Sequence, residues 1–342
     1  MDLSIIIVNW NSADYAAQCV SSIYSQTKNL EYEVIIVDNA STDESCRVFQ
    51  ERLPRLKLIR NAENLGFAKA NNLGFEYSNG RNLLFLNPDT DLRMPAINLM
   101  HSCLESSPSV GILGCKLLNA DLTIQTTCIQ SYPTIMNQMI DIDRLRRLFP
   151  RWRLWSMRPL FEENHGLPVE VDMVSGACLM VKRQVFQKVG RFDPDYFMYT
   201  EDLDLCYRVK RAGWKVCYLG SATIVHYAGQ SSKKKGGEAF SGPMQKETLL
   251  TFFRKTRGHL YARFYRLAML MVAVIRVSIL GVFSIALAVG PNRDSIRSSL
   301  RKWYKILRWS VGLESWTHGP RTRGESQVSR IQSSKASGDS IL

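Results

Sequence analysis

The chain of 342 residues lacks several patterns that define common classes of enzyme. Its eight cysteines include no Cys-x-x-Cys pair and no zinc-like spacing, and no Gly-x-Gly-x-x-Gly follows a predicted strand. These absences argue against a zinc module and against a Rossmann dehydrogenase. A nucleotidyltransferase would need a Gly-rich phosphate loop near the first strand, and Val8-Asn-Trp-Asn11 provides none. The sequence also shows no Ser-His or Cys-His arrangement for covalent catalysis.

Signs of secretion are missing as well. Scattered cysteines within apolar runs behave as small hydrophobic residues and favour a reducing compartment. Met1-Asp-Leu-Ser4 leads directly into a predicted strand, without the basic and apolar segments of a signal peptide. We therefore expect a cytoplasmic protein.

Negative charge is scarce only in the last third of the chain. Residues 231–342 carry 20 Lys and Arg against 6 Asp and Glu, whereas residues 1–230 are close to neutral, with 24 against 25. A neutral body with a basic, partly apolar tail is typical of a protein held at an anionic membrane surface. No nucleic-acid recognition motif accompanies the charge, so we expect no nucleic-acid partner.

Short apolar runs alternate with helix-like segments, which predicts an α/β fold with a mostly parallel sheet and helices on both faces. The expected strands are residues 4–8, 33–37, 56–60, 83–86 and 110–114, then a strand pair within 169–181 and two strands at 214–219 and 222–226. We also expect a hairpin around 119–122 and a helix at 136–149. Helix caps are predicted at Ser12, in a capping box at Ser41-Thr-Asp-Glu44, at Thr200, and at Gly213 as a terminator.

Two carboxylates follow one of the buried runs, in Asn87-Pro-Asp-Thr-Asp91. Side chains at i and i+2 of an extended segment project to the same side, so Asp89 and Asp91 can converge beyond the strand end. Open α/β sheets bind ligands at that edge, and hard oxygen donors suit Mg²⁺ or Mn²⁺ bridging to a phosphate ester. The alternative is a simple polar turn, because Asn, Pro and Asp all favour turns.

Five ordered segments resemble glycosyltransferase family 2, within its rhamnosyltransferase-like branch. They are Val8-Asn-Trp-Asn11, Val37-Asp-Asn-Ala-Ser-Thr-Asp43, Asn64-Leu-Gly-Phe-Ala-Lys-Ala-Asn-Asn72, Asn87-Pro-Asp-Thr-Asp91 and Thr200-Glu-Asp202, within residues 3–230. The resemblance implies a GT-A fold, a dTDP- or UDP-sugar donor, a divalent cation and inversion at the anomeric carbon. It further implies rhamnosyl transfer from dTDP-rhamnose to a lipid-linked or polysaccharide acceptor in cell-surface glycan biosynthesis. The rival functions are a sugar nucleotidyltransferase and a non-catalytic glycan-binding or scaffold protein that retains the fold.

Polar residues near the early strand ends are the candidates for donor binding. Asp38 can accept hydrogen bonds from a pyrimidine N–H or a ribose hydroxyl, although it can also cap the next turn. Gly66 can let backbone approach the ligand, and helix initiation is the alternative explanation for its neighbours. The full predicted donor set is Asn9, Asn11, Asp38, Asn64, Gly66, Asn71, Asn72 and Asp89.

Asp202 is the predicted general base, because the attacking acceptor hydroxyl must lose a proton to a nearby carboxylate. A helix N-terminus lowers the pKa of an Asp, which weakens it as a base, so Glu201 is the alternative. Asp204 is interpreted as a partner of the helix dipole. His226 ends a strand and is a candidate third metal ligand beside Asp89 and Asp91, as in some relatives of this fold class, although a lone His is more often structural.

The C-terminal third is predicted to associate with a membrane. We expect a catalytic domain at 1–230, a basic and apolar helical region at 231–312 with a flexible loop at its start, and a disordered tail at 313–342. A basic amphipathic helix at 244–265 precedes an apolar run at 267–290 that contains one charge, Arg276. A peripheral or monotopic helix at the cytoplasmic face, formed within 243–310, is favoured over a full span. A dimerisation helix, and with it a homodimer, is a third interpretation.

Overall fold

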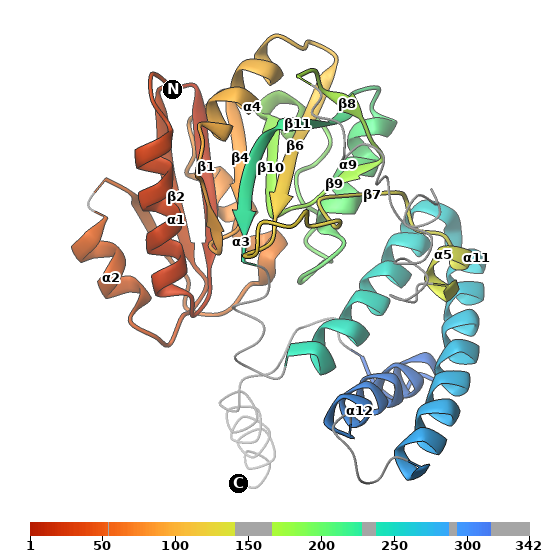
Figure 1. Cartoon of the computed structure of the whole chain (residues 1–342). Helices are drawn as coiled ribbons and strands as arrows, with labels where there is room; N and C mark the ends of the chain where they lie inside the picture. The colour runs from red at the N-terminus through yellow and green to blue at the C-terminus, as the bar shows by residue number, and fades with distance from the viewer. Residues whose placement is uncertain (54, 141–165, 228–236, 287–292, 316–342) are drawn as a thin grey trace, which may run out of the picture.

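The computed structural model describes residues 1–53, 55–140, 166–227, 237–286 and 293–315. Its centre is a nine-stranded sheet with the order β3-β2-β1-β4-β10-β6-β11-β5, to which β8 adds by pairing with β11. Helices cover both faces of this sheet, and two long C-terminal helices extend away from it (Figure 1). The predicted α/β architecture is therefore confirmed.

The first half of the sheet is parallel. It consists of β1 (Leu3–Asn9), β2 (Tyr32–Asp38), β3 (Lys57–Arg60) and β4 (Asn82–Leu86), connected by α1 (Ala13–Gln26), α2 (Ser45–Arg52) and α3 (Gly66–Glu76). The inner strands β1, β2 and β4 are mostly apolar and buried, as expected for strands covered on both faces, whereas the edge strand β3 is partly exposed. The last residues of β1 and β2, Asn9 and Asp38, are register partners. The carboxyl ends of the strands thus form one edge.

The second half of the sheet is mixed. β10 (Cys178–Lys182) runs antiparallel between β4 and β6 (Val110–Leu118), β11 (Lys215–His226) is parallel to β6, and β5 (Thr90–Asp91) is antiparallel to β11. The two strands predicted at 214–219 and 222–226 are wrong as separate elements: they form one strand with a register shift between Leu219 and Thr223. This bulge inserts extra residues without ending the strand, so the chain still reaches the sheet edge at His226.

The strand pair predicted within 169–181 is three short strands. β8 (Val169–Glu170) pairs with β11, whereas β9 (Met173–Val174) pairs with β7 (Ile129–Gln130) in a separate two-stranded sheet. The hairpin expected around 119–122 is present, closed by a bridge between Leu118 and Ile124. The remaining helices of the body are α4 (Ala96–Glu105), α5 (Ile135–Ile140), α8 (Arg183–Lys188) and α9 (Glu201–Arg211). Of the helix predicted at 136–149, residues 141–149 lie outside the described part.

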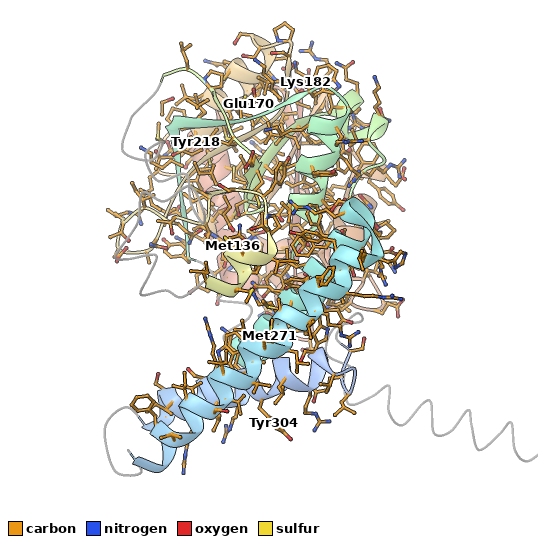
Figure 2. The ribbon with its side chains drawn as sticks, turned by 90° about the vertical axis from the view of Figure 1, so that its right-hand side faces the viewer. Met136, Glu170, Lys182, Tyr218, Met271 and Tyr304 are labelled. Atoms are coloured by element: carbon orange, nitrogen blue, oxygen red, sulfur yellow. The ribbon has the colours of Figure 1, made fainter. Side chains whose placement is uncertain are left out.

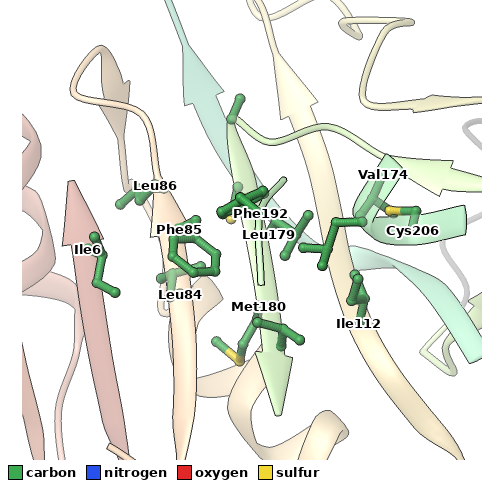
Figure 3. Close-up of a cluster of buried hydrophobic side chains, with 14 of the residues drawn as sticks. Ile6, Leu84, Phe85, Leu86, Ile112, Val174, Leu179, Met180, Phe192 and Cys206 are labelled. Atoms are coloured by element: carbon green, nitrogen blue, oxygen red, sulfur yellow. The ribbon is translucent and has the colours of Figure 1, made fainter. Parts of the chain in front are cut away.

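A buried aromatic cluster joins the two halves of the sheet. Phe85 of β4 lies 4.7 Å from Phe192 and 5.0 Å from Phe186 between ring centroids, in tilted or edge-on arrangements. Figure 3 shows Phe85 and Phe192 between β4 and β10, near Leu179. Burying a side chain of this size contributes about 1.5–3 kcal/mol. The cluster therefore fixes β4 against β10, and with them the loops that follow each strand end.

Ser12 and Thr200 stand at the predicted N-cap positions of α1 and α9, but neither side chain makes a capping hydrogen bond, and the predicted capping box does not form. The Ser12 hydroxyl donates to the Trp10 carbonyl, and Ser41 binds the loop after β1 instead of capping a helix. α2 begins later than the predicted capping box, at Ser45. Thr200 precedes α9 but makes no capping hydrogen bond through its side chain. The terminator Gly213 is confirmed, since it follows α9 with φ +88°.

The C-terminal helices are α11 (Gly237–Ala286) and α12 (Arg293–Ser310). α11 comprises both predicted helices, 244–265 and most of 267–290, but it breaks at Gly258 (φ 87°, ψ 169°) and not between them. Its first half packs on the body: the Phe252 ring contacts Tyr207 of α9 at 5.6 Å, and Lys255 Nζ lies 2.6 Å from Asp195 Oδ2. Packing therefore continues across the boundary predicted at residue 230. Residues 231–236 of the predicted flexible loop and the tail beyond residue 315 lie outside the described residues.

Candidate functional site

A cleft of about 540 Å³ lies at the carboxyl ends of the central strands. The strand ends contribute Val8, Trp10, Asn39, Asn87, Asp89 and His226, and the opposite wall comes from the residues around Gly176, from the start of α9 and from the first half of α11. Of the predicted site residues, Asn64, Gly66, Asp89, Glu201, Asp202 and His226 line this cleft, whereas Asn9, Asn11, Asp38, Asn71, Asn72 and Asp91 do not.

Asn9 and Asp38 form the floor beneath the cleft. Asn9 Nδ2 donates to Asp38 Oδ1 over 2.8 Å, and both side chains are buried. The other oxygen of Asp38 accepts from the Ser41 amide, and Asn11 holds the same loop by accepting from the Thr42 amide over 2.7 Å. The alternative role for Asp38, fixing the next turn, is thus the one seen in the structure. Donor binding by Asn9, Asn11 and Asp38 remains a prediction that their positions do not support.

Asn71 and Asn72 both act within the fold. Asn71 Nδ2 donates to the Phe67 carbonyl one turn earlier in α3. Asn72 clamps the backbone of Phe192, donating to its carbonyl over 2.8 Å and accepting from its amide over 3.1 Å. Neither residue lines the cleft: Asn71 shares a helix face with Phe67 but lies one turn further along α3, and Asn72 faces Phe192. The prediction that they line the donor pocket is wrong.

Gly66 marks a close approach of two backbone segments at the cleft wall. It has φ +79°, and the next amide, Phe67 N–H, donates to the Phe197 carbonyl over 2.6 Å. A Cβ at Gly66 would clash with that carbonyl oxygen and with the Phe197 ring. The requirement for glycine is confirmed, but its partner is the loop before α9 and not only a ligand.

Asn39 organises the donor side of the cleft, although its role was not predicted. This buried amide donates to Asn64 Oδ1 over 2.7 Å, and its oxygen accepts from Asn61 Nδ2 and from the Leu65 amide. Asn64 Oδ1 in turn accepts from the Gly66 amide. The network fixes the loop between β3 and α3 at the cleft. The signal was present in the sequence, as Asn39 directly follows Asp38 in the same motif.

Asp89 and His226 meet at the cleft, but Asp91 does not join them. Asp89 Oδ1 lies 3.2 Å from His226 Nε2. Asp91 points elsewhere, where its carboxylate accepts from Arg93 Nε (3.2 Å) and from the Tyr227 hydroxyl (3.3 Å). The same-side rule fails because Asp89 lies in a turn, and extended geometry begins only with β5. Among the residues that the structure describes, no three His, Cys, Asp or Glu side chains form a metal cluster, so the three-ligand arrangement is wrong.

Asp89 and His226 nevertheless fit a divalent cation. His226 Nδ1 lies 2.7 Å from Gln125 Oε1, an acceptor, so Nδ1 carries the ring proton, and Nε2 is an acceptor that faces both Asn87 Nδ2 (3.2 Å) and Asp89 Oδ1. Two acceptors 3.2 Å apart are stabilised by a shared cation. Mg²⁺ and Mn²⁺ sites commonly use one or two protein ligands and complete the shell with phosphate oxygens and water. Gln125 would orient the imidazole from behind, a role that the sequence gave no means of finding.

Asp202 lies at the cleft wall as a partly accessible carboxylate. Its Oδ2 accepts from the Gly176 amide and its Oδ1 from the Leu203 amide, both over 2.8 Å. Burial raises the pKa of Asp202 above its ordinary value, although these backbone N–H groups oppose the shift. The backbone N–H groups at the helix N-terminus lower this pKa as expected, but burial outweighs them and the net shift is upward. A carboxylate with a raised pKa is a stronger base, which removes the objection to Asp202.

Glu201 is buried more deeply than its neighbour. Its Oε2 finds no hydrogen-bond partner among the described residues, and its pKa is raised well above the ordinary value, first by burial and then by the charge of Asp202. Asp204 faces the core instead, where Arg208 Nε donates to it over 2.7 Å, in line with its predicted structural role. The two residues directly before α9, Tyr199 and Thr200, line the cleft and have positive φ, near 70°. Such strain commonly marks functional loops.

The first half of α11 completes the cleft. Gln245, Lys246 and Leu249 line it, and Lys246 Nζ donates to Gln138 Oε1 over 2.9 Å. Thr248 is joined to Thr200 by a hydrogen bond of 2.8 Å between the two hydroxyls. Lys246 is the one Lys or Arg among the described lining residues, so it offers positive charge to an anionic substrate. Sequence reasoning missed this wall because it placed the helix in the membrane-associated region.

Comparison with known proteins places this geometry in a family. The family model described as "Glycosyltransferase like family 2" matches residues 2–237. The chain is 27% identical over 243 residues to the N-acetylglucosaminyl-diphospho-decaprenol L-rhamnosyltransferase of Mycobacterium tuberculosis, covering 67% of this chain and 77% of that protein. It is 24% identical over 247 residues to the rhamnosyltransferase WbbL of Escherichia coli, covering 69% of this chain and 87% of that protein.

A solved structure shows the same fold. The mannosyltransferase of Pyrobaculum calidifontis, determined in complex with GDP-Man and Mn²⁺, superimposes with a TM-score of 0.55 at 15% identity, covering 92% of this chain and 88% of that one. At this identity the likeness concerns the fold alone. Together with the family match over most of the length, these findings show that the chain belongs to glycosyltransferase family 2, in its rhamnosyltransferase-like branch, and is a glycosyltransferase with a GT-A-like fold.

Proposed function

We propose that this glycosyltransferase moves a sugar from a dTDP- or UDP-sugar to a lipid-linked or polysaccharide acceptor, with inversion at the anomeric carbon. Rhamnose from dTDP-rhamnose is the favoured donor, since relatives in two organisms carry that activity in their names. The observation that carries the proposal is one cleft that holds two neighbouring carboxylates, the buried Glu201 and the partly accessible Asp202, together with the Asp89–His226 pair.

Asp202 acts as the general base in the proposed reaction. The acceptor hydroxyl attacks the anomeric carbon and forms the new C–O bond while the bond to the diphosphate oxygen breaks. The hydroxyl proton passes to the Asp202 carboxylate, and the nucleoside diphosphate leaves with the electron pair. The Gly176 and Leu203 amides hold the carboxylate in place, one on each oxygen. A single base suffices for inversion, in agreement with the lack of a Ser-His or Cys-His pair in the sequence.

Asp89 and His226 would hold the Mg²⁺ or Mn²⁺ ion beside the donor diphosphate. When bound, such an ion neutralises the charge that develops on the leaving group. Asn39 and Asn64 shape the donor side, and Lys246 adds a positive charge on the facing wall. The support for a cation is the fit of the two side chains together with the Mn²⁺ held by a protein of the same fold.

The first test is release of nucleoside diphosphate from a panel of dTDP- and UDP-sugars, with Mg²⁺ or Mn²⁺ and with excess chelator. We expect release, fastest with dTDP-rhamnose, that chelator abolishes and added cation restores. Asp89→Asn is expected to lower the rate by about 100-fold or more, whereas Asp91→Asn, outside the cleft, should change it much less. Undiminished activity in excess chelator would contradict the proposed need for a divalent cation. Equal losses of activity in Asp89→Asn and Asp91→Asn would show that Asp91 is also a metal ligand.

We also propose that the protein works at the cytoplasmic face of the cell membrane, attached through residues 243–310. α11 is long and apolar enough over Gly242–Phe283 to cross a membrane by length and composition. The name of the mycobacterial relative describes a substrate on a decaprenol lipid, which supports a lipid-linked acceptor for this chain. Such acceptors lie in the bilayer, so an enzyme that uses one needs to reach its surface.

A further inference from the structure

The second half of α11, from His259 onward, has one face that no other described part of the chain covers. Large apolar side chains follow a helical spacing along it and are about half exposed or more: Leu260, Phe264, Leu267, Met271, Val274, Ile275, Ile279 and Val282. The steps of three and four residues place them on one face of the helix. We call this set the apolar stripe. It contains no acidic residue, and Arg263 lies exposed among its first members. Contiguous apolar surface of this length normally marks a binding site.

The opposite face of the same segment is packed against α12. Tyr265, Met269 and Ala273 are fully buried there, facing a side of α12 that includes Ile306 and Trp309. Two arginines fix the pairing, which makes the helices antiparallel: Arg266 donates to the Trp309 and Ser310 carbonyls, and the Arg276 guanidinium lies 4.2 Å from the Trp303 ring centroid. Figure 2 shows this pair, with Met271 on α11 and Tyr304 on α12. Arg276, the charge that interrupts the apolar run, is therefore used within the helix pair.

The charge of α12 argues against a transmembrane arrangement. Its 18 residues contain six Lys or Arg and one Asp, and Arg297 and Arg301 are exposed. Each charge at the centre of a bilayer costs about 2.5–3.5 kcal/mol on insertion scales. A vertical α11 would carry α12 into the hydrocarbon with it, or would lose the contacts that bury Tyr265 and Trp309. A helix pair with one apolar stripe and many basic residues instead suits the surface of a bilayer.

We infer that the second half of α11 and α12 form a helical hairpin that lies in the plane of an anionic lipid bilayer, with the apolar stripe inserted among the acyl chains. The basic residues of the hairpin then meet lipid phosphates, and 9 Lys or Arg against 1 Asp or Glu between residues 259 and 310 provide the matching charge. The inference rests on the proposed membrane location but not on the proposed reaction. Because the first half of α11 lines the cleft, the hairpin also fixes the height of the cleft above the bilayer.

The experiment uses the purified full-length chain and preformed vesicles, either phosphatidylcholine alone or an equal mixture with phosphatidylglycerol. Binding is measured by flotation, and bound protein is then washed with alkaline carbonate. We expect binding to the mixed vesicles, binding weaker by about tenfold or more to phosphatidylcholine alone, and release by carbonate. The double variant Phe264→Gln/Ile275→Gln should bind the mixed vesicles about tenfold or more weakly. The matched control, Leu99→Gln/Leu122→Gln, alters exposed apolar residues of the body and should bind as the unaltered chain does.

The possible outcomes distinguish the in-plane hairpin from the proposed membrane location and from the proposed transfer reaction. Protein that resists carbonate would overturn the in-plane hairpin while leaving the membrane location intact. Failure to bind either vesicle would overturn both, and equal loss in the control variant would show that the apolar stripe is not the contact. Unfolding temperature and nucleoside diphosphate release in the absence of lipid are measured for every variant. They should match the unaltered chain, because the stripe contacts neither the cleft nor the core.

Discussion

Asp202 and Glu201 show two neighbouring carboxylates with different surroundings. Asp202 has a backbone N–H on each oxygen, whereas Glu201 leaves Oε2 without a partner among the described residues. Burial raises the pKa of both, and in Asp202 it outweighs the helix N-terminus that favours the charged form. Asp202, which is held by two backbone amides and is partly accessible, is therefore the better candidate for the general base.

Asp202→Asn is therefore expected to abolish transfer while leaving donor binding intact. The amide cannot accept the proton, so the rate should fall by about 100- to 10,000-fold, the usual contribution of a general base. Binding of nucleoside diphosphate, measured by calorimetry, should stay within about threefold, because the substitution keeps the shape of the cleft wall. The matched variant is Glu201→Gln. If that change alone eliminates transfer, Glu201 is the base.

The pH dependence of transfer also tests the assignment of Asp202 as the general base. A base must be ionised, so activity is lost as the pH falls through its pKa. Because burial raises the pKa of Asp202 above 3.8, the acid limb of the kcat/KM profile should lie above that value. Glu201→Gln should leave an acid limb in place, since the burial of Asp202 is the main cause of its shift. An acid limb at or below pH 3.8 would contradict the assignment.

The loop between β3 and α3 and the loop before α9 meet at Gly66. Neither loop can move away, as Asn39 and Asn64 hold the first and the Thr200–Thr248 hydrogen bond holds the second. The left-handed backbone at Gly66 and the carbonyl of Phe197 next to it leave no room for a side chain. The contact between the two loops at Gly66 thus shapes this wall of the cleft through backbone atoms.

We expect Gly66→Ala to destabilise the protein by about 3 kcal/mol or more, from left-handed strain together with a steric clash. Gly190 is the matched control, since it also has positive φ but open space around its Cβ position. Gly190→Ala should cost about 1 kcal/mol, from backbone strain alone. Urea unfolding measures both values. Equal losses would show that the contact with Phe197 is not rigid.

α11 belongs to two parts of the molecule at once. Its first half is packed on α9 and lines the cleft, and its second half, beyond Gly258, carries the apolar stripe. The strong contacts of Phe252 and Lys255 with the body mean that the catalytic domain does not end where the sequence pattern changes. A glycine with non-helical backbone separates the two roles within one helix.

Deleting residues 243–342 is accordingly expected to do more than release the protein from membranes. It removes Phe252 and Phe253, which are buried, so the remaining chain should lose about 3 kcal/mol or more of stability and its transfer activity. Deleting 259–342 keeps those residues and Lys246 and should be milder. Thermal unfolding and vesicle flotation of both truncations separate the effects. A 1–242 fragment as stable as the full chain would contradict the packing described here, and one that still floats with lipid would show that the tail is not the anchor.

Much of the fold was predictable because it depends on local patterns. The apolar runs predicted β1 to β4 to within one residue at each end, and Gly213 ended α9 where the sequence indicated. The failures have a common cause. Ser12, Ser41 and Thr200 are good capping residues in isolation, but their hydroxyls are engaged by groups outside the helix they were expected to cap. Capping is worth about 1 kcal/mol, so a competing tertiary contact can displace it.

The sequence by itself determined the family, the order of the strands along the chain and the identity of the acidic residues. Only the tertiary structure decided which of them meet, because the deciding contacts join segments far apart in sequence. His226 is oriented by Gln125, Asp202 by Gly176, and Lys246 reaches the cleft beside Gln138. Asp91, only two residues from Asp89, turns away because the backbone between them is not extended. The spacing of two residues along the chain predicts whether their side chains point the same way only where the local backbone geometry is known.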